Sequence, residues 1–208
     1  MKLLFPLTLI FLLTACSTTK FRSAWTREKA PEFYQARLTT TKGDVDIAVT
    51  RNWSPLAADR FYQLVRHHAL DGILFYRVVP DFVAQFGEID TTKEVHWKKV
   101  TIVDEPVIKG NTRGRISFAR AGVNTRSIHL FINLRDNSRL DTVTYNGVNG
   151  FPAIGEVVKG MNAVDALYKG YGNRTMDLSD SIGSDRKRFM DLFPQLDSIK
   201  KAAIVTLK

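Results

Sequence analysis

One stretch, Phe75–Glu88, constrains the fold of this chain more than any other, because it is dense in aromatic and β-branched residues and is broken once by a proline. Such residues favour strands, whereas proline is confined to strand edges, ends and bulges. The stretch therefore predicts a strand, a kink at Pro80 and a second strand. Because side chains alternate along a strand, the residues of each predicted strand divide between two faces. Before the kink, one face is expected to hold Phe75, Arg77 and Val79, and after it one face is expected to hold Phe82, Ala84 and Phe86.

Arg77 is the unusual member of this stretch. A buried strand rarely holds an arginine, because its guanidinium must be paired or must face a cleft. The pattern alone leaves two interpretations open: Arg77 is an edge residue of a core strand, or it belongs to a functional site.

Two blocks of sequence, in a fixed order, favour the interpretation that Arg77 belongs to a functional site. The first contains Phe75, Tyr76, Arg77, Val78, Val79, Phe82, Gln85, Gly87 and Glu88, and the second is Gly114–Thr125 followed by His129–Ile132. The first resembles the cyclophilin-type peptidyl-prolyl isomerase signature F-H-R-[IV]-[IV]-x-x-F-x-x-Q-x-G-[DE]. The second is similar to that family's G-x-[IL]-[SA]-M-A-[NR] segment leading to Q-F-F-I. The resemblance extends over residues 37–207.

The resemblance implies a fold class. We expect a mainly β protein with a closed, eight-stranded, antiparallel cyclophilin-like barrel, capped by two helices and carrying a C-terminal helical insertion. A segment ending in Phe193–Lys200 is similar to the insertion of bacterial lipoprotein cyclophilins.

Local patterns agree with several of these elements. Lys42-Gly43-Asp44 lies between two Thr- and Val-rich runs and predicts a hairpin. Ser54-Pro55 predicts a helix start with Ser54 as cap. The expected inward stripe of that helix is Ala57, Phe61, Leu64, Val65 and His68. A short helix is expected over Asp185–Phe193, with Ser184 as cap and with Phe189, Leu192 and Phe193 docked on the barrel.

The resemblance also implies the site residues. It makes Arg77 and Gln85 catalytic, with Gln85 orienting Arg77 and binding the substrate backbone. It implies that an apolar pocket for the proline ring is formed by Phe82, Val83, Phe131 and Leu140. The backbone of Ala119 and Arg120 would pair with the peptide segment before proline, and the remaining expected substrate-binding residues are His129 and Phe151.

Four positions depart from the usual eukaryotic pattern of the family. Arg139 stands for a tryptophan, Phe151 for the cleft histidine, Arg120 for an asparagine and His129 for a glutamine. Arg139 puts binding of the drug cyclosporin in doubt. His129 is open to two interpretations, a substrate contact or a structural hydrogen bond. We expect retained activity with an altered peptide preference.

The N-terminus is typical of an exported lipoprotein. Lys2 precedes an apolar run, Leu3–Leu13, that is too short for a permanent membrane helix and fits a signal peptide. The run ends in Leu13-Thr14-Ala15-Cys16, which resembles a bacterial lipobox. We interpret residues 1–15 as the signal peptide and Cys16, the only cysteine, as the lipidated residue; the alternative is a buried or incidental thiol.

Two further segments follow from this interpretation. Residues 16–31 form a lipid-anchored tether with several basic side chains, and residues 32–208 form the isomerase domain. We expect a membrane contact through the lipid on Cys16 at the bacterial cell envelope. Ser17 follows the cysteine in place of aspartate, which favours the outer membrane facing the periplasm.

Charge and motifs restrict the remaining partners. The formal net charge of +9 permits acidic partners, but the lysines and arginines are scattered with no aromatic-interleaved basic stripe, so nucleic-acid binding is unsupported. His67 and His68 are adjacent and point to different faces of a helix, and a zinc-type ligand spacing is absent from the sequence. We expect no metal and no cofactor, and proline-containing polypeptides as partners.

Two other functions remain possible from the sequence. The four departures are compatible with a non-catalytic module that only binds proline peptides. A lipoprotein whose domain serves as an envelope scaffold is the weaker alternative. The favoured function is a peptidyl-prolyl cis-trans isomerase that assists the folding of exported or envelope proteins.

Overall fold

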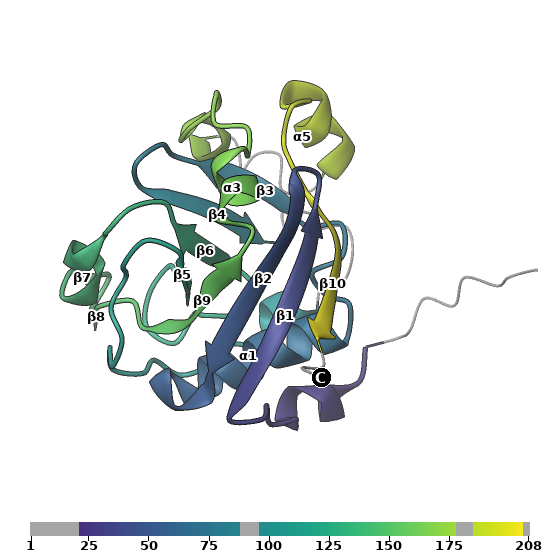
Figure 1. Ribbon diagram of the computed structural model, residues 1–208. Helices are drawn as coiled ribbons and strands as arrows, with labels where there is room; N and C mark the ends of the chain where they lie inside the picture. The colour runs from purple at the N-terminus through teal and green to yellow at the C-terminus, as the bar shows by residue number, and fades with distance from the viewer. Residues whose placement is uncertain (1–20, 88–95, 178–184, 206–208) are drawn as a thin grey trace, which may run out of the picture.

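One curled antiparallel sheet organises the protein in a computed structural model that describes residues 21–87, 96–177 and 185–205 (Figure 1). The strand order is β10-β1-β2-β9-β5-β6-β4-β3. The expected mainly β, eight-stranded, cyclophilin-like architecture is confirmed. The strands of this sheet are β1 (Phe33–Thr40), β2 (Gly43–Thr50), β3 (Leu74–Val78), β4 (Val83–Gly87), β5 (Arg115–Phe118), β6 (Leu130–Asn133), β9 (Ala153–Lys159) and β10 (Ile199–Val205). A separate small sheet pairs β7 (Thr144–Tyr145) with β8 (Val148–Asn149).

The two ends of the sheet meet over a short stretch. Leu74 of β3 forms a single bridge with Ser198, the residue that immediately precedes β10. Two backbone hydrogen bonds flank it, from the amide of Phe75 to the carbonyl of Asp197 at 2.9 Å and from the amide of Ile199 to the carbonyl of Ile73 at 2.8 Å. The barrel is therefore closed by a few bonds rather than by a full strand ladder.

The β1–β2 hairpin forms where turn chemistry predicted it. Thr40 pairs with Gly43, which leaves Thr41 and Lys42 as the two-residue loop. Gly43 has a φ of +127°, a value open to glycine but strained for other residues. Val45, Ile47 and Val49 are buried inside the barrel as the alternation predicts.

Strand β3 departs from the expected alternation. Leu74 pairs with Gly87 and Arg77 with Gln85, so three steps on β3 face two on β4, which is a β-bulge. Phe75 and Val78 consequently belong to the interior core, whereas Leu74 and Tyr76 pack in a separate cluster with Phe189 and Phe193 of the C-terminal insertion. The prediction that Phe75 and Arg77 share a face is therefore wrong.

The set expected after the kink is also divided. Ala84 and Phe86 lie in the interior core. Phe82 lies before the start of β4 and packs with the outward-facing Val83 instead. The alternation therefore fails at the junction between the turn and the strand.

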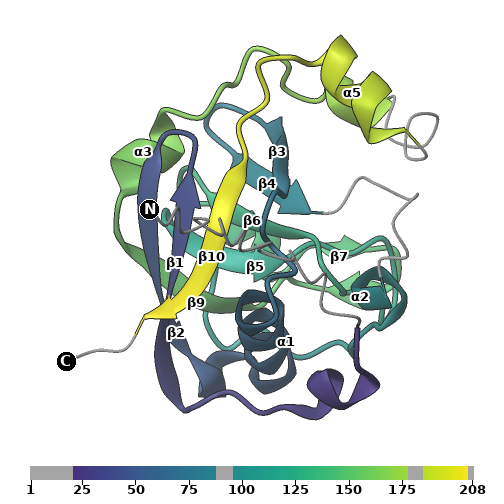
Figure 2. The same ribbon diagram turned by 90° about the vertical axis from the view of Figure 1, so that its right-hand side faces the viewer.

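Helix α1 (Pro55–Arg66) covers one end of the barrel (Figure 2). Ala57, Phe61, Leu64 and Val65 are buried as expected, whereas His68 lies beyond the helix, exposed and with a positive φ, so its inward placement was wrong. Ser54 does not cap the helix with its side chain.

The first turn of α1 is capped from a distance instead. The Glu105 carboxylate accepts hydrogen bonds from the amides of Leu56 at 2.8 Å and Ala57 at 3.1 Å, and from the hydroxyl of Ser54 at 2.5 Å. A carboxylate is favourable there because a helix N-terminus carries partial positive charge.

The other helices are short. They are α2 (His96–Lys99), α3 (Met161–Asp165) and α5 (Arg186–Leu192), with 3₁₀ turns η1 (Ser23–Arg27), η2 (Arg51–Trp53) and η3 (Ser138–Asp141). Asp185 caps α5 by accepting from the amide of Arg188, while the expected cap Ser184 lies outside the described residues. Phe189 and Phe193 are buried as predicted, but Leu192 is half exposed.

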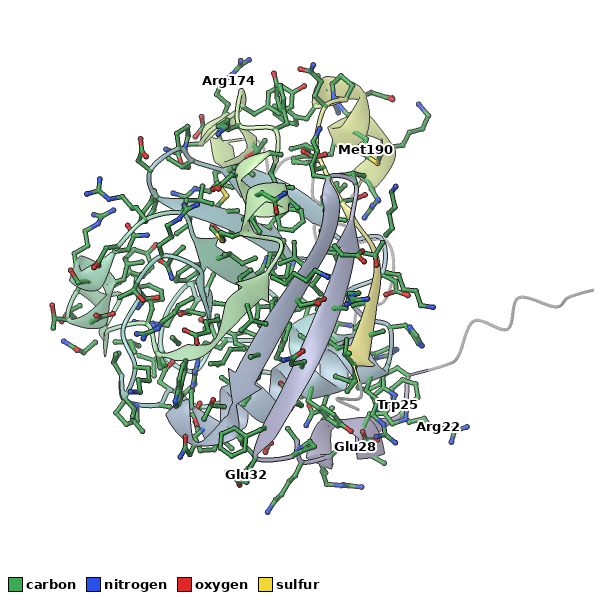
Figure 3. All side chains as sticks on the ribbon, viewed as in Figure 1. Arg22, Trp25, Glu28, Glu32, Arg174 and Met190 are labelled. Atoms are coloured by element: carbon green, nitrogen blue, oxygen red, sulfur yellow. The ribbon has the colours of Figure 1, made fainter. Side chains whose placement is uncertain are left out.

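Residues 21–31, the described part of the expected tether, pack beside α1 (Figure 3). The Trp25 ring stacks on His67 with centroids 4.1 Å apart, and Glu28 approaches the same imidazole at 3.0 Å. The amide of Ala30 donates to Asp59 of α1. This part of the segment is docked on the barrel, and the division of the chain at residue 31 stays a prediction.

Candidate active site

A row of outward-facing residues crosses four neighbouring strands. Arg77 of β3 is opposite Gln85 of β4, Gln85 is opposite Phe131 of β6, and Phe131 is opposite Ser117 of β5. The bulge in β3 brings Arg77 into this row. Two motif blocks that are separate in the sequence are thereby combined on one outer surface of the barrel.

Arg77 is held by neutral groups. Its Nη1 donates to Oε1 of Gln85 at 3.0 Å, and its Nε donates to Oδ1 of Asn173 at 2.7 Å. Its Cζ lies 5.4 Å from the centroid of the Phe82 ring. Burial lowers the pKa of the guanidinium from its ordinary value. Within the described part of the chain Arg77 has no carboxylate partner.

An apolar cluster lies next to this arginine. Val83, Phe131 and Leu140 are buried, and Phe82, Ala119 and Phe151 pack on them while staying partly exposed. The rings of Phe131 and Phe151 meet edge to face at 5.9 Å. The structure thus brings together the residues expected to form the proline pocket.

The Asn111 side chain fixes one wall of this cluster. Asn111 is fully buried, and its Nδ2 donates to Asp141 and to the carbonyl of Phe151, both at 2.7 Å. The hydroxyl of Ser117 donates to its Oδ1 at 2.8 Å. Because Leu140 and Asp141 belong to η3, this amide ties the η3 loop and Phe151 to strand β5.

At two of the four positions that depart from the usual family pattern, an arginine places its guanidinium group over an aromatic ring. The Cζ of Arg139 lies 4.7 Å from the Phe82 centroid, and that of Arg120 lies 3.9 Å from the Phe151 centroid. Such contacts are favourable by about 0.5–2 kcal/mol, depending on desolvation. Arg139 is exposed, whereas Arg120 is buried and donates to the carbonyl of Val148 at 3.1 Å.

A cavity of about 390 Å³ adjoins the apolar cluster at Phe82. Its remaining lining is polar and comes from Asp81, Arg135, Asp136, Asn137, Ser138 and Arg139. Phe131 and Leu140 do not line it. It therefore lies beside the expected proline pocket, on the side where Arg139 lies.

His129 makes the structural hydrogen bond that was one of its two interpretations. Its Nδ1 lies 3.1 Å from the Tyr76 hydroxyl, and the two rings meet edge to face at 5.7 Å. The amide of Ala119 donates to the His129 carbonyl at 2.9 Å. Of the Ala119 backbone groups, the carbonyl is therefore the one left for a peptide.

Sequence reasoning missed three contributors. Tyr76 was visible as the residue in place of the motif's histidine. Asn173 contacts Arg77 from 96 positions away, and no local pattern signals it. Asn137 likewise lies outside both motif blocks. Its side chain donates to the backbone carbonyl of Phe82 at 2.8 Å and so fixes the backbone that carries the Phe82 ring.

Some expectations concern residues that the structure leaves undescribed. Glu88 of the motif and Cys16 of the lipobox both lie outside the described residues. In the described ranges no three His, Cys, Asp or Glu side chains come close enough to hold a metal. Among the helices of those ranges, none combines the length and the hydrophobicity that a membrane-spanning segment requires.

Comparisons with known proteins agree with this geometry. Residues 35–183 match the family model described as cyclophilin type peptidyl-prolyl cis-trans isomerase/CLD. A peptidyl-prolyl cis-trans isomerase of Acinetobacter baylyi is 30% identical over 130 residues, which cover 62% of this chain and 68% of that protein. Peptidyl-prolyl cis-trans isomerase A of Dickeya dadantii is 30% identical over 162 residues, which cover 74% of this chain and 80% of the relative.

Proposed function

This chain belongs to the cyclophilin-type peptidyl-prolyl cis-trans isomerase family, and from that premise we propose that Arg77 and Gln85 carry the reaction on proline-containing exported or envelope proteins. The chain is a cyclophilin-type isomerase acting on proline-containing peptides. Its residue roles, its peptide preference and its place in the cell are the proposal.

The reaction needs no broken bond. Rotation about a peptide bond has a barrier of about 18–20 kcal/mol, because the nitrogen lone pair is delocalised into the carbonyl. In the twisted amide that lone pair returns to the prolyl nitrogen, which becomes a hydrogen-bond acceptor. A donor aimed at this nitrogen stabilises the twisted state more than either planar isomer, and so raises the rate.

Arg77 is the proposed donor. A guanidinium stays charged and presents a fixed fork of N–H groups, which a lysine ammonium does not reproduce. Gln85 holds Nη1 at 3.0 Å and Asn173 holds Nε at 2.7 Å, which leaves other N–H groups of the fork for the substrate. The single observation that carries the proposal is this oriented arginine, free of carboxylate partners in the described chain, beside the Phe82 ring.

The apolar cluster is the proposed seat of the proline ring. Phe131, Leu140 and Val83 would form its floor, with Phe82 at the edge nearest Arg77. Holding the ring still while the preceding carbonyl rotates lowers the entropy cost of reaching the twisted state. The Ala119–Arg120 backbone is proposed to bind the residues before proline.

Arg139 is the proposed basis of an altered peptide preference. It is exposed, contacts Phe82 and has no ion pair in the part of the chain that is described. An unpaired guanidinium at the edge of the pocket favours acidic side chains near the proline. Each exposed ion pair of this kind is worth about 0.2–1 kcal/mol.

The cell envelope is the proposed location, and a lipid on Cys16 is the proposed anchor. The support is the N-terminal sequence alone, since these residues lie outside the described structure. Two or more acyl chains hold a protein stably at a membrane, where one does not. Metabolic labelling with a radioactive fatty acid should label the wild type and leave Cys16→Ser unlabelled; equal labelling of both, or of neither, contradicts the anchor.

An isomerisation assay tests the residue roles. Line-shape or exchange NMR on a proline peptide measures kcat/KM without a coupling protease. We expect Arg77→Ala to lose about 100-fold, as for the removal of one preorganised donor. Arg188→Ala, an exposed arginine on α5, is the matched control for the lost charge. An Arg77→Ala variant as fast as the control contradicts the proposed role.

A further inference from the structure

Tyr76 and His129 form a buried pair behind the proposed catalytic arginine. Tyr76 is 4% exposed and lies on β3 beside Arg77, whereas His129 immediately precedes β6. A Cβ atom at position 87 would collide with the imidazole, so glycine at that position lets the ring pack against β4. Neither side chain is needed to explain the proline pocket.

The pair continues a chain of hydrogen bonds that begins at Arg77. Nη1 of Arg77 is 3.0 Å from Oε1 of Gln85, and Nε2 of Gln85 is 2.5 Å from Oη of Tyr76. Oη of Tyr76 is 3.1 Å from Nδ1 of His129. Four side chains from three strand regions are therefore joined in one line.

The donors in this line all run in one direction. A guanidinium can only donate, so the Gln85 oxygen must face Arg77 and its amide nitrogen must face Tyr76. The Tyr76 oxygen then accepts from Gln85, and its single proton is left for Nδ1 of His129. His129 must accordingly be neutral, with its own proton on Nε2.

We propose that Tyr76 and His129 are positioning residues for the isomerase reaction, which lock the Gln85 amide in the orientation that holds the Arg77 guanidinium towards the substrate. This inference rests on the proposed role of Arg77. Without an acceptor at His129 the Tyr76 proton is orphaned, and without Tyr76 the Gln85 amide nitrogen loses its partner. Either change lets the Gln85 amide turn its nitrogen towards Arg77, where two donors repel.

The surroundings keep the His129 imidazole and the Tyr76 hydroxyl in their neutral forms. Burial first, and the positive charge of Lys98 on α2 second, lower the pKa of His129 to about 4. Burial raises the pKa of Tyr76 despite the nearby Arg77 charge. In the described chain, Tyr76 of β3 contacts His129 through a hydrogen bond, and Lys98 of α2 acts on it through its charge.

The direction of the pH dependence follows from these shifts. The imidazole is neutral above its folded pKa, so the line of donors is complete at neutral pH. Below about pH 4 the imidazole is protonated at both nitrogens, and Nδ1 becomes a second donor to Tyr76. We therefore expect kcat/KM to fall as pH decreases through that region, with circular dichroism showing a folded protein at each pH.

Substitutions at three positions, Tyr76, Gln85 and His129, test the proposal in the full chain. Tyr76→Phe should lower kcat at pH 7 by about 10-fold, whereas KM should change by less than twofold. The reason is that the variant loses the orientation of the Gln85 amide and keeps peptide binding. In a Gln85→Ala background the same change should have no further effect, because the group that Tyr76 orients is already gone. His129→Gln offers an acceptor that does not titrate, so its kcat/KM should no longer fall as the pH decreases towards 4. Its activity should also exceed that of His129→Phe, which offers no acceptor.

Two results would overturn the positioning role. One is an unchanged kcat for Tyr76→Phe at pH 7. The other is a loss of the same size in the wild-type and Gln85→Ala backgrounds, which marks a general effect on folding. A fully active Arg77→Ala variant would instead refute the proposed function itself, so the two failures are distinct.

Discussion

Arg77, which is partly buried, and Arg126, which is fully buried, show two different uses of an arginine in one molecule. Arg77 is held by the neutral amides of Gln85 and Asn173 and lies over the Phe82 ring. Arg126 is 1% exposed and faces carboxylates, with Nη2 at 3.1 Å from Glu105 and Nε at 3.5 Å from Asp104.

The two arginines differ in whether their positive charge is compensated by neighbouring carboxylates. The Arg126 charge is compensated by carboxylates, one of which also caps α1, so this arginine joins the helix to the Asp104–Glu105 segment. The Arg77 charge is oriented by its neighbours and left uncompensated by them. Substitution at one site should therefore change stability, and substitution at the other should change rate.

The largest expected effect is on the stability of Arg126→Met. Removing this guanidinium leaves two buried or half-buried carboxylates without their partner, and breaking such a pair costs about 3–5 kcal/mol. Urea unfolding followed by tryptophan fluorescence measures it. The fraction still folded should keep the wild-type kcat/KM, and a stability loss below 1 kcal/mol would break the comparison.

A smaller loss is expected for Glu105→Gln. The amide keeps the shape of the side chain but loses the charge that serves Arg126 and the first turn of α1, where Leu56 and Ala57 donate to it. Hydrogen bonds to a charged group contribute about 1.5–3 kcal/mol. We expect the unfolding free energy to fall by about 2 kcal/mol with kcat/KM unchanged; a loss of activity at full stability would show that this network reaches the site.

The smallest expected effect concerns Arg139. Wild-type protein should prefer a peptide with glutamate next to proline over one with lysine by about 2–5-fold in kcat/KM, the size expected of an exposed ion pair. Arg139→Ala should abolish the preference, as should 1 M salt, where the screening length is about 3 Å. Arg188→Ala should keep it. A preference that survives Arg139→Ala assigns it to another group.

Local and motif information predicted much of the fold. The β1–β2 hairpin and the buried stripe of α1 follow from turn chemistry and from helical spacing, which act over a few residues. The motif blocks around Arg77 and His129 also meet as expected, because cross-strand pairing joins Arg77, Gln85 and Phe131 in one row.

What escaped prediction depends on contacts between distant segments. The bulge in β3 moves Arg77 off the face of Phe75, and alternation cannot anticipate an extra residue in a ladder. Glu105 displaces Ser54 as helix cap from 51 positions away, and Asn173 reaches Arg77 from 96. Such partners are set by how the loops close over the barrel.

The central claim is that the Arg77 guanidinium supplies rate and not stability. The most direct measurement is kcat/KM and unfolding free energy for Arg77→Lys, taken on the same preparation as the wild type. Lysine keeps the positive charge and loses the fork. We predict a loss in kcat/KM of at least about 10-fold with a change in unfolding free energy below about 1 kcal/mol. Wild-type activity in this variant, or a loss that only matches its unfolded fraction, would contradict the account.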